Sequence, residues 1–164
     1  MTEAVASTFS RLTPVGAPVV GQVELAEEII NRVSSVEQLR FTNSGTEATM
    51  GATRIARAAT GRDIVVKAIG GYHGSYPDLD YFLRPDVYPA GIPADSPIRL
   101  FHYNDPDGLE AVLADCGGDV AAVVLEPVLG AGGIIPPEEG FLEASRELTQ
   151  ATGALLVLDE VISF

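Results

Sequence analysis

The chain alternates continuous apolar runs with segments whose apolar residues recur at helical spacing. Apolar runs without polar alternation are typical of strands that a parallel sheet buries on both faces. Four such runs cover residues 63–69, 98–103, 120–125 and 154–158. Helices are predicted between them, one from residues 104–106 towards Cys116 and one over residues 138–152. This alternation predicts an α/β fold with a largely parallel sheet.

The N-terminal part and one internal segment are less regular. An amphipathic helix is predicted over residues 21–33. Residues 1–15 show no clear periodicity and are predicted to form an irregular N-terminal arm. Residues 77–96 are rich in proline and aspartate and are predicted to form a long loop without an element of its own.

Residues 39–62 are predicted to form a short strand, a tight polar turn and a helix. The strand is expected at residues 40–42, where aromatic and β-branched side chains occur. Ser44 and Glu47 fit a capping box, in which Ser44 accepts from the amide of Glu47 and Glu47 reaches back to the amide of Ser44. Gly61 fits the end of the helix. Apolar residues recur at helical spacing at Ala48, Ile55 and Ala59.

The start of this helix is a candidate anion site. The first amides of a helix have no internal partner, and the helix dipole favours negative charge there. The hydroxyls of Ser44 and Thr46 would add donors, and Gly45 would let a ligand approach the backbone closely. The same pattern also fits an ordinary capped helix with nothing bound.

Polar and aromatic residues follow the predicted strands where each one ends. Tyr72 and His73 lie in a glycine-rich segment after the first run, whereas Glu126 and Asp159 follow the third and the fourth. Ligands of parallel α/β folds bind beyond the carboxyl ends of the strands. We therefore expect these residues and the helix start to line one crevice. The glycine-rich segment fits a backbone bent to present Tyr72 and His73, and equally a plain loop with a surface tyrosine.

Composition and charge narrow the classes of partner. The chain has 164 residues, of which 46% are hydrophobic, enough for one globular domain with a core. Its net charge of −13 argues against a nucleic-acid partner and against an anionic membrane surface. Cys116 is the single cysteine, so no internal disulfide is expected, which fits the cytoplasm. No apolar run is as long as a membrane span, and the first residues lack the pattern of a signal peptide.

In combination, these motifs resemble the fold-type I, class III pyridoxal-phosphate enzymes, and above all their glutamate-1-semialdehyde aminomutase branch. The matching stretches are RFTNSGTEATM, GGYHG, VVLEPVLGAGGIIPPEEGFL and ALLVLDEV. The resemblance implies a partial large domain over residues 16–164, with α/β/α layers around a mostly parallel sheet. It also implies pyridoxal 5′-phosphate as cofactor, an amino-acid or amino-ketone substrate, and a homodimer in the complete protein.

The resemblance also implies a role for individual residues of the first two motifs. Ser44, Gly45 and Thr46 look like the cup for the cofactor phosphate, in agreement with the anion argument. Tyr72 looks like the aromatic ring that stacks on the pyridine face. His73 is similar to the histidine beside that ring, whose role is less defined.

Three residues of the later motifs complete the implied site. Asp159 looks like the catalytic carboxylate that pairs with the protonated pyridine nitrogen, because an anionic partner keeps that nitrogen protonated. Val161 looks like the apolar contact on the other face of the ring. Glu126 is similar to an acid near the edge of the cofactor and receives no firm role.

The chain departs from the family pattern in several places. In the family, a lysine on a later strand forms a Schiff base with the cofactor, whereas the single lysine here, Lys67, lies inside a predicted strand. Its amine is expected at a sheet face or in solvent. Ile162 replaces a frequent glutamine, and Ala131 an asparagine of the aminomutase branch. We therefore expect an incomplete copy, without the Schiff-base lysine segment and the C-terminal small domain, that does not turn over alone.

Two other functions stay open. The chain could be a non-catalytic cofactor-binding or assembly half-subunit that pairs with a lysine-bearing chain. Alternatively, Glu126, Asp159 and Glu160 at the strand ends could hold Mg²⁺ in a phosphate-handling domain, since Mg²⁺ prefers oxygen ligands.

Overall fold

The computed structural model describes residues 1–9, 17–77, 79 and 96–164. Contacts divide the chain into two units, Met1–Phe41 and Thr42–Phe164. The first unit contains α1 (Thr2–Phe9) and α2 (Val20–Arg32), and neither helix has a buried residue. The helix predicted over residues 21–33 is therefore confirmed to within one residue at each end.

The irregular arm predicted for residues 1–15 needs correction, because its first part is the helix α1. A helix that buries no side chain needs no apolar stripe, so its sequence carries no helical periodicity. Ala4 and Ala6 favour helix through their intrinsic propensity alone. The domain boundary expected after residue 15 lies outside the described residues and stays a prediction.

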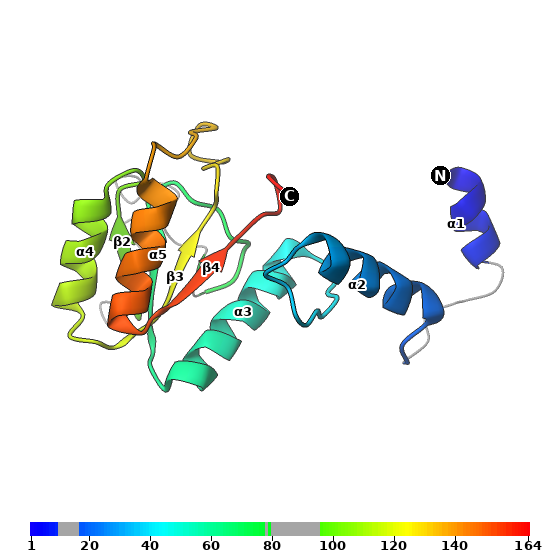
Figure 1. The fold of residues 1–164 in the computed structure, drawn as a ribbon, viewed down its shortest axis with the longest axis horizontal. Coiled ribbons are helices and arrows are strands. Elements are labelled where there is room, and N and C mark those ends of the chain that lie inside the picture. The colour runs from blue at the N-terminus through cyan, green and yellow to red at the C-terminus, as the bar shows by residue number, and fades with distance from the viewer. Residues whose placement is uncertain (10–16, 78, 80–95) are drawn as a thin grey trace. The chain divides into compact units, whose positions relative to one another are not determined.

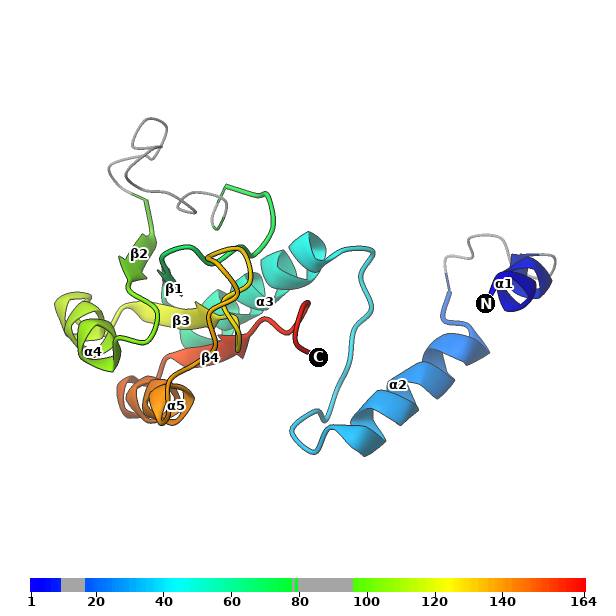
Figure 2. The same ribbon diagram turned by 90° about the horizontal axis from the view of Figure 1, so that it is seen from above.

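A four-stranded sheet, in the order β2-β1-β3-β4, forms the centre of the second unit, and every pairing is parallel. Figure 1 labels β2, β3 and β4, and Figure 2 labels all four strands. They are β1 (Ile64–Ala68), β2 (Ile98–Phe101), β3 (Val120–Leu125) and β4 (Leu155–Leu158). All four predicted strands of this sheet are present, which confirms the α/β class with a parallel sheet.

Helices cover both faces of this sheet, which gives the α/β/α layers that the resemblance implied (Figure 2). The helices are α3 (Gly45–Thr60), α4 (Pro106–Asp115) and α5 (Phe141–Thr152). On β3, Val123 and Leu125 pack in the core with α4 and α5, whereas Ala122 and Val124 pack in the core with α3. The side chains of a strand alternate between faces, so one apolar run serves both cores.

The chain leaves β1 and β3 towards opposite faces of the sheet. Leu79, which follows β1, packs with Ala56 of α3, whereas the segment after β3 leads to α5 on the other face. β1 and β3 are neighbours in the sheet. Adjacent parallel strands whose connections diverge in this way open a crevice at their carboxyl ends. Tyr72 and His73 follow β1, and Glu126 follows β3.

Two local predictions were wrong. Residues 40–42 form no strand, and Phe41 is 39% exposed, because no described segment pairs with them. β4 is an edge strand rather than a buried one, so Leu155 and Leu158 are 40% and 45% exposed. The segment for which a long loop was predicted, residues 77–96, lies almost wholly outside the described residues, so that loop stays a prediction.

The buried face of α3 also differs from the apolar one that its sequence suggests. α3 buries Thr49, Thr53 and Ala56, whereas Ile55 is 65% exposed. The hydroxyl of Thr53 donates to the carbonyl of Thr49 at 3.1 Å, so burial leaves it satisfied. Within the described parts of the chain, the helices are too short or too polar to cross a membrane.

Candidate functional site

The N-terminus of α3 offers free backbone donors. Ser44 Oγ accepts from the amide of Glu47 at 3.2 Å, which confirms the predicted cap. The carboxylate of Glu47 reaches back to the amide of Asn43 at 2.8 Å rather than to that of Ser44, which corrects the predicted partner by one residue. No described residue accepts from the amides of Gly45 and Thr46. These two amides are thus available for an anion.

The segment after β1, residues 69–77, reaches this helix start and is called the Tyr72 loop below. Gly74 has φ +95° and packs on Thr46, whose Cα lies 2.6 Å from where a Cβ on Gly74 would be. The hydroxyl of Thr49 donates to the carbonyl of His73 at 2.6 Å. The backbone therefore bends towards α3, with His73 buried and Tyr72 45% exposed.

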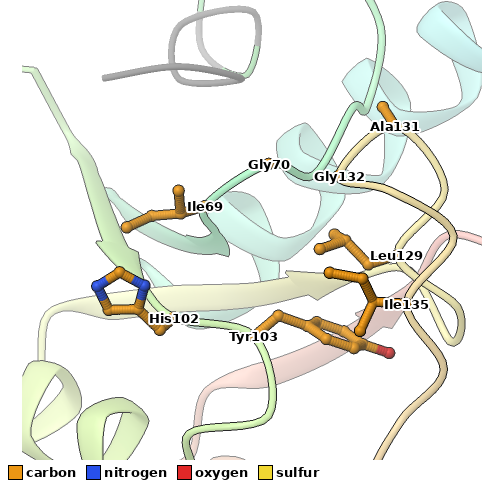
Figure 3. A pocket seen from close by; sticks show the side chains of 8 residues that line it. All are labelled: Ile69, Gly70, His102, Tyr103, Leu129, Ala131, Gly132 and Ile135. Carbon is orange, nitrogen blue, oxygen red and sulfur yellow. The ribbon is translucent and has the colours of Figure 1, made fainter. Parts of the chain in front are cut away.

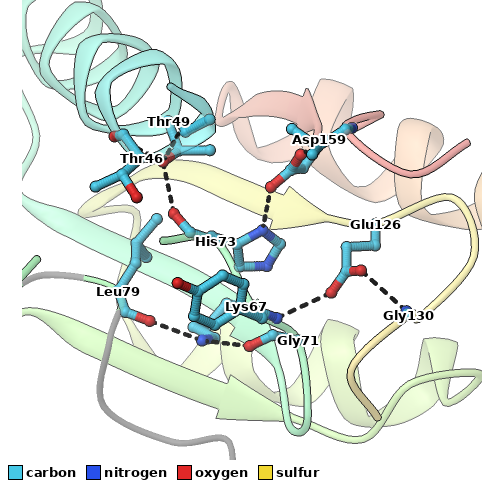
Figure 4. A network of polar contacts seen from close by, with 12 residues as sticks. Thr46, Thr49, Lys67, Gly71, His73, Leu79, Glu126, Gly130 and Asp159 are labelled. Carbon is cyan, nitrogen blue, oxygen red and sulfur yellow. Dashed lines mark hydrogen bonds and ion pairs between the residues drawn. The ribbon is translucent and has the colours of Figure 1, made fainter. Parts of the chain in front are cut away.

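His73 and Asp159 form a buried pair, in which His73 Nδ1 and Asp159 Oδ2 are 2.9 Å apart (Figure 4). The side chain of His73 is fully buried and that of Asp159 is 5% exposed. Asp159 Oδ1 also accepts from the amide of Val161 at 3.2 Å. The amide of Asp159 donates to Leu125 at the end of β3, which fixes the aspartate against the sheet.

These contacts keep Asp159 ionised. Burial pushes the pKa of Asp159 up, but the hydrogen bond from His73, the amide of Val161 and the charge on His73 together bring it below its ordinary value of 3.8. A carboxylate only accepts hydrogen bonds, so His73 Nδ1 carries the proton between them. The other ring nitrogen of His73, Nε2, is buried and has no partner among the described residues.

Glu126 connects the Tyr72 loop to the segment after β3. Its Oε1 accepts from the amide of Tyr72 and its Oε2 from the amide of Gly130, both at 2.9 Å. The residue is 5% exposed. Glu126, for which the sequence indicated no role, therefore holds two loops at the carboxyl edge of the sheet.

The predicted residues form a closed series of contacts. Thr46 packs on Gly74, which follows His73, and His73 bonds to Asp159. Val161, which is 68% exposed, returns to the helix start, because its Cγ2 lies 3.1 Å from where a Cβ on Gly45 would be. The structure thus brings the helix start, the Tyr72 loop and the end of β4 together at one edge, as expected from the sequence.

Lys67 belongs to this region, although the sequence placed it at an unspecified sheet face or in solvent. It is 1% exposed and shares the α3 side of β1 with Val65. Its Nζ donates to the carbonyls of Gly71 at 2.8 Å and of Leu79 at 2.9 Å. A lysine inside an otherwise apolar strand was the signal for such a buried role.

A half-open cavity of about 630 Å³ lies beside these contacts (Figure 3). Its lining residues come from the ends of β1 and β2 and from residues 129–135. They include none of the eight predicted cofactor residues. In the described ranges, no group of three acidic, histidine or cysteine side chains is arranged to hold a metal ion.

Fold and site together define a parallel three-layer α/β domain, in which a helix start with two free backbone amides lies beside an ionised aspartate that a histidine supports. The chain belongs to the aminotransferase class-III family, whose match covers residues 1–163. Members of this family are pyridoxal-phosphate-dependent enzymes.

Among curated proteins, the chain is similar to glutamate-1-semialdehyde 2,1-aminomutase from Methanothermobacter thermautotrophicus, with 44% identity over 98% of this chain and 40% of that protein. Among solved structures, it is similar to an omega-transaminase from Sphaerobacter thermophilus (36% identity, TM-score 0.91), over 99% of this chain and 40% of the other. A glutamate-1-semialdehyde aminomutase from Pseudomonas aeruginosa aligns with 33% identity and a TM-score of 0.87, over 99% and 37%. The chain thus spans about 40% of the length of these relatives.

Proposed function

We propose that this chain is the cofactor-binding part of a pyridoxal-phosphate-dependent transaminase or aminomutase that moves an amino group on an amino-acid or amino-ketone substrate. The observation that carries the proposal is the closed series of contacts from Thr46 through His73 and Asp159 to Val161. It joins a cluster of hydrogen-bond donors to a buried carboxylate, and a phosphorylated pyridine needs donors for its phosphate and an anion for its ring nitrogen.

The residues fit this cofactor in chemistry. The amides of Gly45 and Thr46, with the hydroxyls of Ser44 and Thr46, would hold the phosphate. The ionised Asp159 would pair with the protonated ring nitrogen, and His73 keeps that carboxylate oriented. When bound, the cofactor supplies an electron sink for the substrate carbon.

Two exposed side chains complete the proposed site, and one buried carboxylate supports it. Tyr72 offers an aromatic face and Val161 an apolar one, which would take the two faces of the ring. Glu126 acts through the backbone, because both of its oxygens hold amides of the surrounding loops. Glu126 therefore positions Tyr72, and each of its two carboxylate oxygens already accepts a hydrogen bond.

The covalent and proton-transfer steps of transamination need a lysine amine that is placed at the cofactor, and the single lysine of residues 1–164 is engaged elsewhere. Lys67, the single lysine, is buried and donates to two backbone carbonyls. We therefore propose that residues 1–164 alone bind the cofactor without turning over an amino acid. The complete protein would supply the amine, act as a homodimer and lie in the cytoplasm.

A second candidate follows from Lys67, the single lysine, whose amine is engaged with two backbone carbonyls. A non-catalytic half-subunit would bind the cofactor and pair with a lysine-bearing chain. The Mg²⁺ alternative has less support, because Glu126 and Asp159 direct their oxygens at backbone amides and His73.

Titration of the chain with pyridoxal phosphate, inorganic phosphate and Mg²⁺ tests the proposal. Thr46→Val should weaken binding of both phosphate compounds about tenfold, because a hydrogen bond to a charged group contributes roughly 1.5–3 kcal/mol. Thr60→Val, at the other end of α3, is the matched control and should leave both affinities unchanged. Equal affinities in the wild type and Thr46→Val, or saturable binding of Mg²⁺ alone, would contradict the proposal.

A further inference from the structure

Lys67 holds the two ends of the segment that carries Tyr72 and His73. Its carbonyl partners are Gly71, just before Tyr72, and Leu79, beyond the Tyr72 loop (Figure 4). Both bonds are buried. The ammonium group of Lys67 thus connects the residue before Tyr72 to a residue just beyond the Tyr72 loop.

The chemistry of this position calls for a donor with several hydrogens. Backbone carbonyls are acceptors only, so two of them are satisfied by one side chain only if that side chain donates twice. An ammonium group has three hydrogens and can do so. An apolar residue, such as the neighbouring Val65, would leave both carbonyls without this partner, and buried acceptors without a partner are costly.

The Tyr72 loop is also held from α3 and from β3. Thr49 donates to the carbonyl of His73, and Glu126 accepts from the amide of Tyr72. Both contacts depend on the loop lying where Lys67 holds it. Moving Gly71 would shift the adjacent amide of Tyr72, and with it the ring of His73 that supports Asp159.

We propose that Lys67 is a positioning residue of the cofactor site, which fixes the Tyr72 loop by tying Gly71 to Leu79. The inference rests on the proposed function for its consequence, although the loop contact itself can be measured without cofactor. The amine of Lys67 is used to shape the aromatic and aspartate part of the site, whereas the free phosphate-binding amides of Gly45 and Thr46 belong to α3 itself.

Hydrogen exchange on the cofactor-free chain tests the loop contact. In Lys67→Met, which keeps the length of the stem and removes the donors, the amide of Tyr72 should exchange about tenfold faster or more, because a charge-assisted hydrogen bond restrains it indirectly. Val65→Ala is the matched control, since it makes a cavity on the same strand and face but keeps the ammonium group and both of its carbonyl partners. Equal exchange of the Tyr72 amide in both variants, once global unfolding is subtracted, would overturn the inference.

Restoring the ammonium group separates positioning from general damage. In a Cys116→Ala background, Lys67→Cys can be alkylated with 2-bromoethylamine in denaturant, which rebuilds a side chain of lysine length and charge. After refolding, the alkylated chain should regain slow exchange at Tyr72. An alkylated chain that folds but exchanges as fast as the unmodified cysteine variant would count against Lys67.

A measurement on the unaltered chain covers the case in which these variants do not fold. Lysine-selective ¹⁵N labelling gives one side-chain signal, because the sequence has one lysine. Its ammonium hydrogens should exchange far more slowly than those of the free amino acid. Exchange at the rate of a solvated ammonium would refute the buried contact.

Cofactor titration then distinguishes this inference from the proposed function. Lys67→Met should weaken pyridoxal phosphate at least several-fold while leaving inorganic phosphate unchanged. If the wild type binds neither compound but Lys67→Met still accelerates exchange at Tyr72, the proposed function fails and the loop contact stands. Equal loss of both ligands would place Lys67 in general stability and refute its positioning role.

Discussion

Replacing Glu126 by glutamine should lower the free energy of unfolding by about 2–4 kcal/mol. Each carboxylate oxygen accepts one backbone amide at 2.9 Å, from Tyr72 and from Gly130. Glutamine keeps one acceptor, so one of the two amides would face an NH₂ group, which is itself a donor. Losing a hydrogen bond to a charged group costs roughly 1.5–3 kcal/mol, and leaving a buried donor without a partner costs about 1–3 kcal/mol. These two costs overlap, which sets the expected range.

Urea unfolding of the chain, followed by circular dichroism, measures this loss. Glu139→Gln makes the same chemical change on an exposed residue and is expected to shift stability by less than about 0.5 kcal/mol. Hydrogen exchange at Tyr72 and Gly130 should show that at least one of the two amides loses protection locally. An unfolding free energy for Glu126→Gln equal to that of Glu139→Gln would refute the assigned role of the buried carboxylate.

Three further predictions follow from the same contacts. Gly74→Ala should lower the free energy of unfolding by more than about 2 kcal/mol, because its Cβ would overlap Thr46. Gly117→Ala is the control, since Gly117 has φ +60° and open space around it, and should cost only about 1 kcal/mol. Equal shifts of the melting temperature in the two variants would contradict this prediction. Asp159 has a lowered pKa, so its ionised form stabilises the fold above pH 3.8, and that contribution is lost as the pH falls through the lower pKa of the folded state. Asp159→Asn should therefore reduce the loss of stability at acid pH. An unchanged loss of stability at acid pH would count against the His73–Asp159 pair. Leu158→Lys on the exposed edge strand β4 should reduce the self-association measured by sedimentation velocity, because an apolar edge strand can pair with strands of other molecules. A wild-type chain that is already a monodisperse monomer would show this prediction to be wrong.

The location of the residues that follow the strands could be predicted from the sequence, because it depends only on the order and direction of the strands. Parallel strands present their carboxyl ends at one edge, so Glu126 and Asp159 could be assigned to a common crevice from the order of the apolar runs. The pairing of His73 with Asp159 spans 86 positions, and no local pattern indicates which residue faces the carboxylate. The family resemblance indicated that His73 and Asp159 both belong to the cofactor site. The structure shows that they are bonded to each other and that the proton between them is on His73 Nδ1.

The wrong predictions for β4 and α3 concern burial, because the same sequence pattern can be buried or exposed depending on which elements pack around it. An apolar run such as residues 154–158 predicts a strand, but only its neighbours decide whether it lies at the centre or at the edge. On α3, two of the three buried residues are threonines, whose hydroxyls are satisfied by the helix and by His73. For Lys67, the sequence left a sheet face and solvent both open, and only its carbonyl partners, Gly71 and Leu79, show where the amine lies.

The central claim is that this chain holds pyridoxal phosphate through the start of α3 and Asp159 while Lys67 stays engaged with the backbone. Borohydride reduction of the chain with pyridoxal phosphate, followed by peptide mapping and a half-transamination assay with an amino acid, tests it most directly. The account predicts saturable cofactor binding, sparse labelling shared with the N-terminal amine, and no formation of pyridoxamine phosphate. Stoichiometric labelling of Lys67 together with conversion to pyridoxamine phosphate would contradict it.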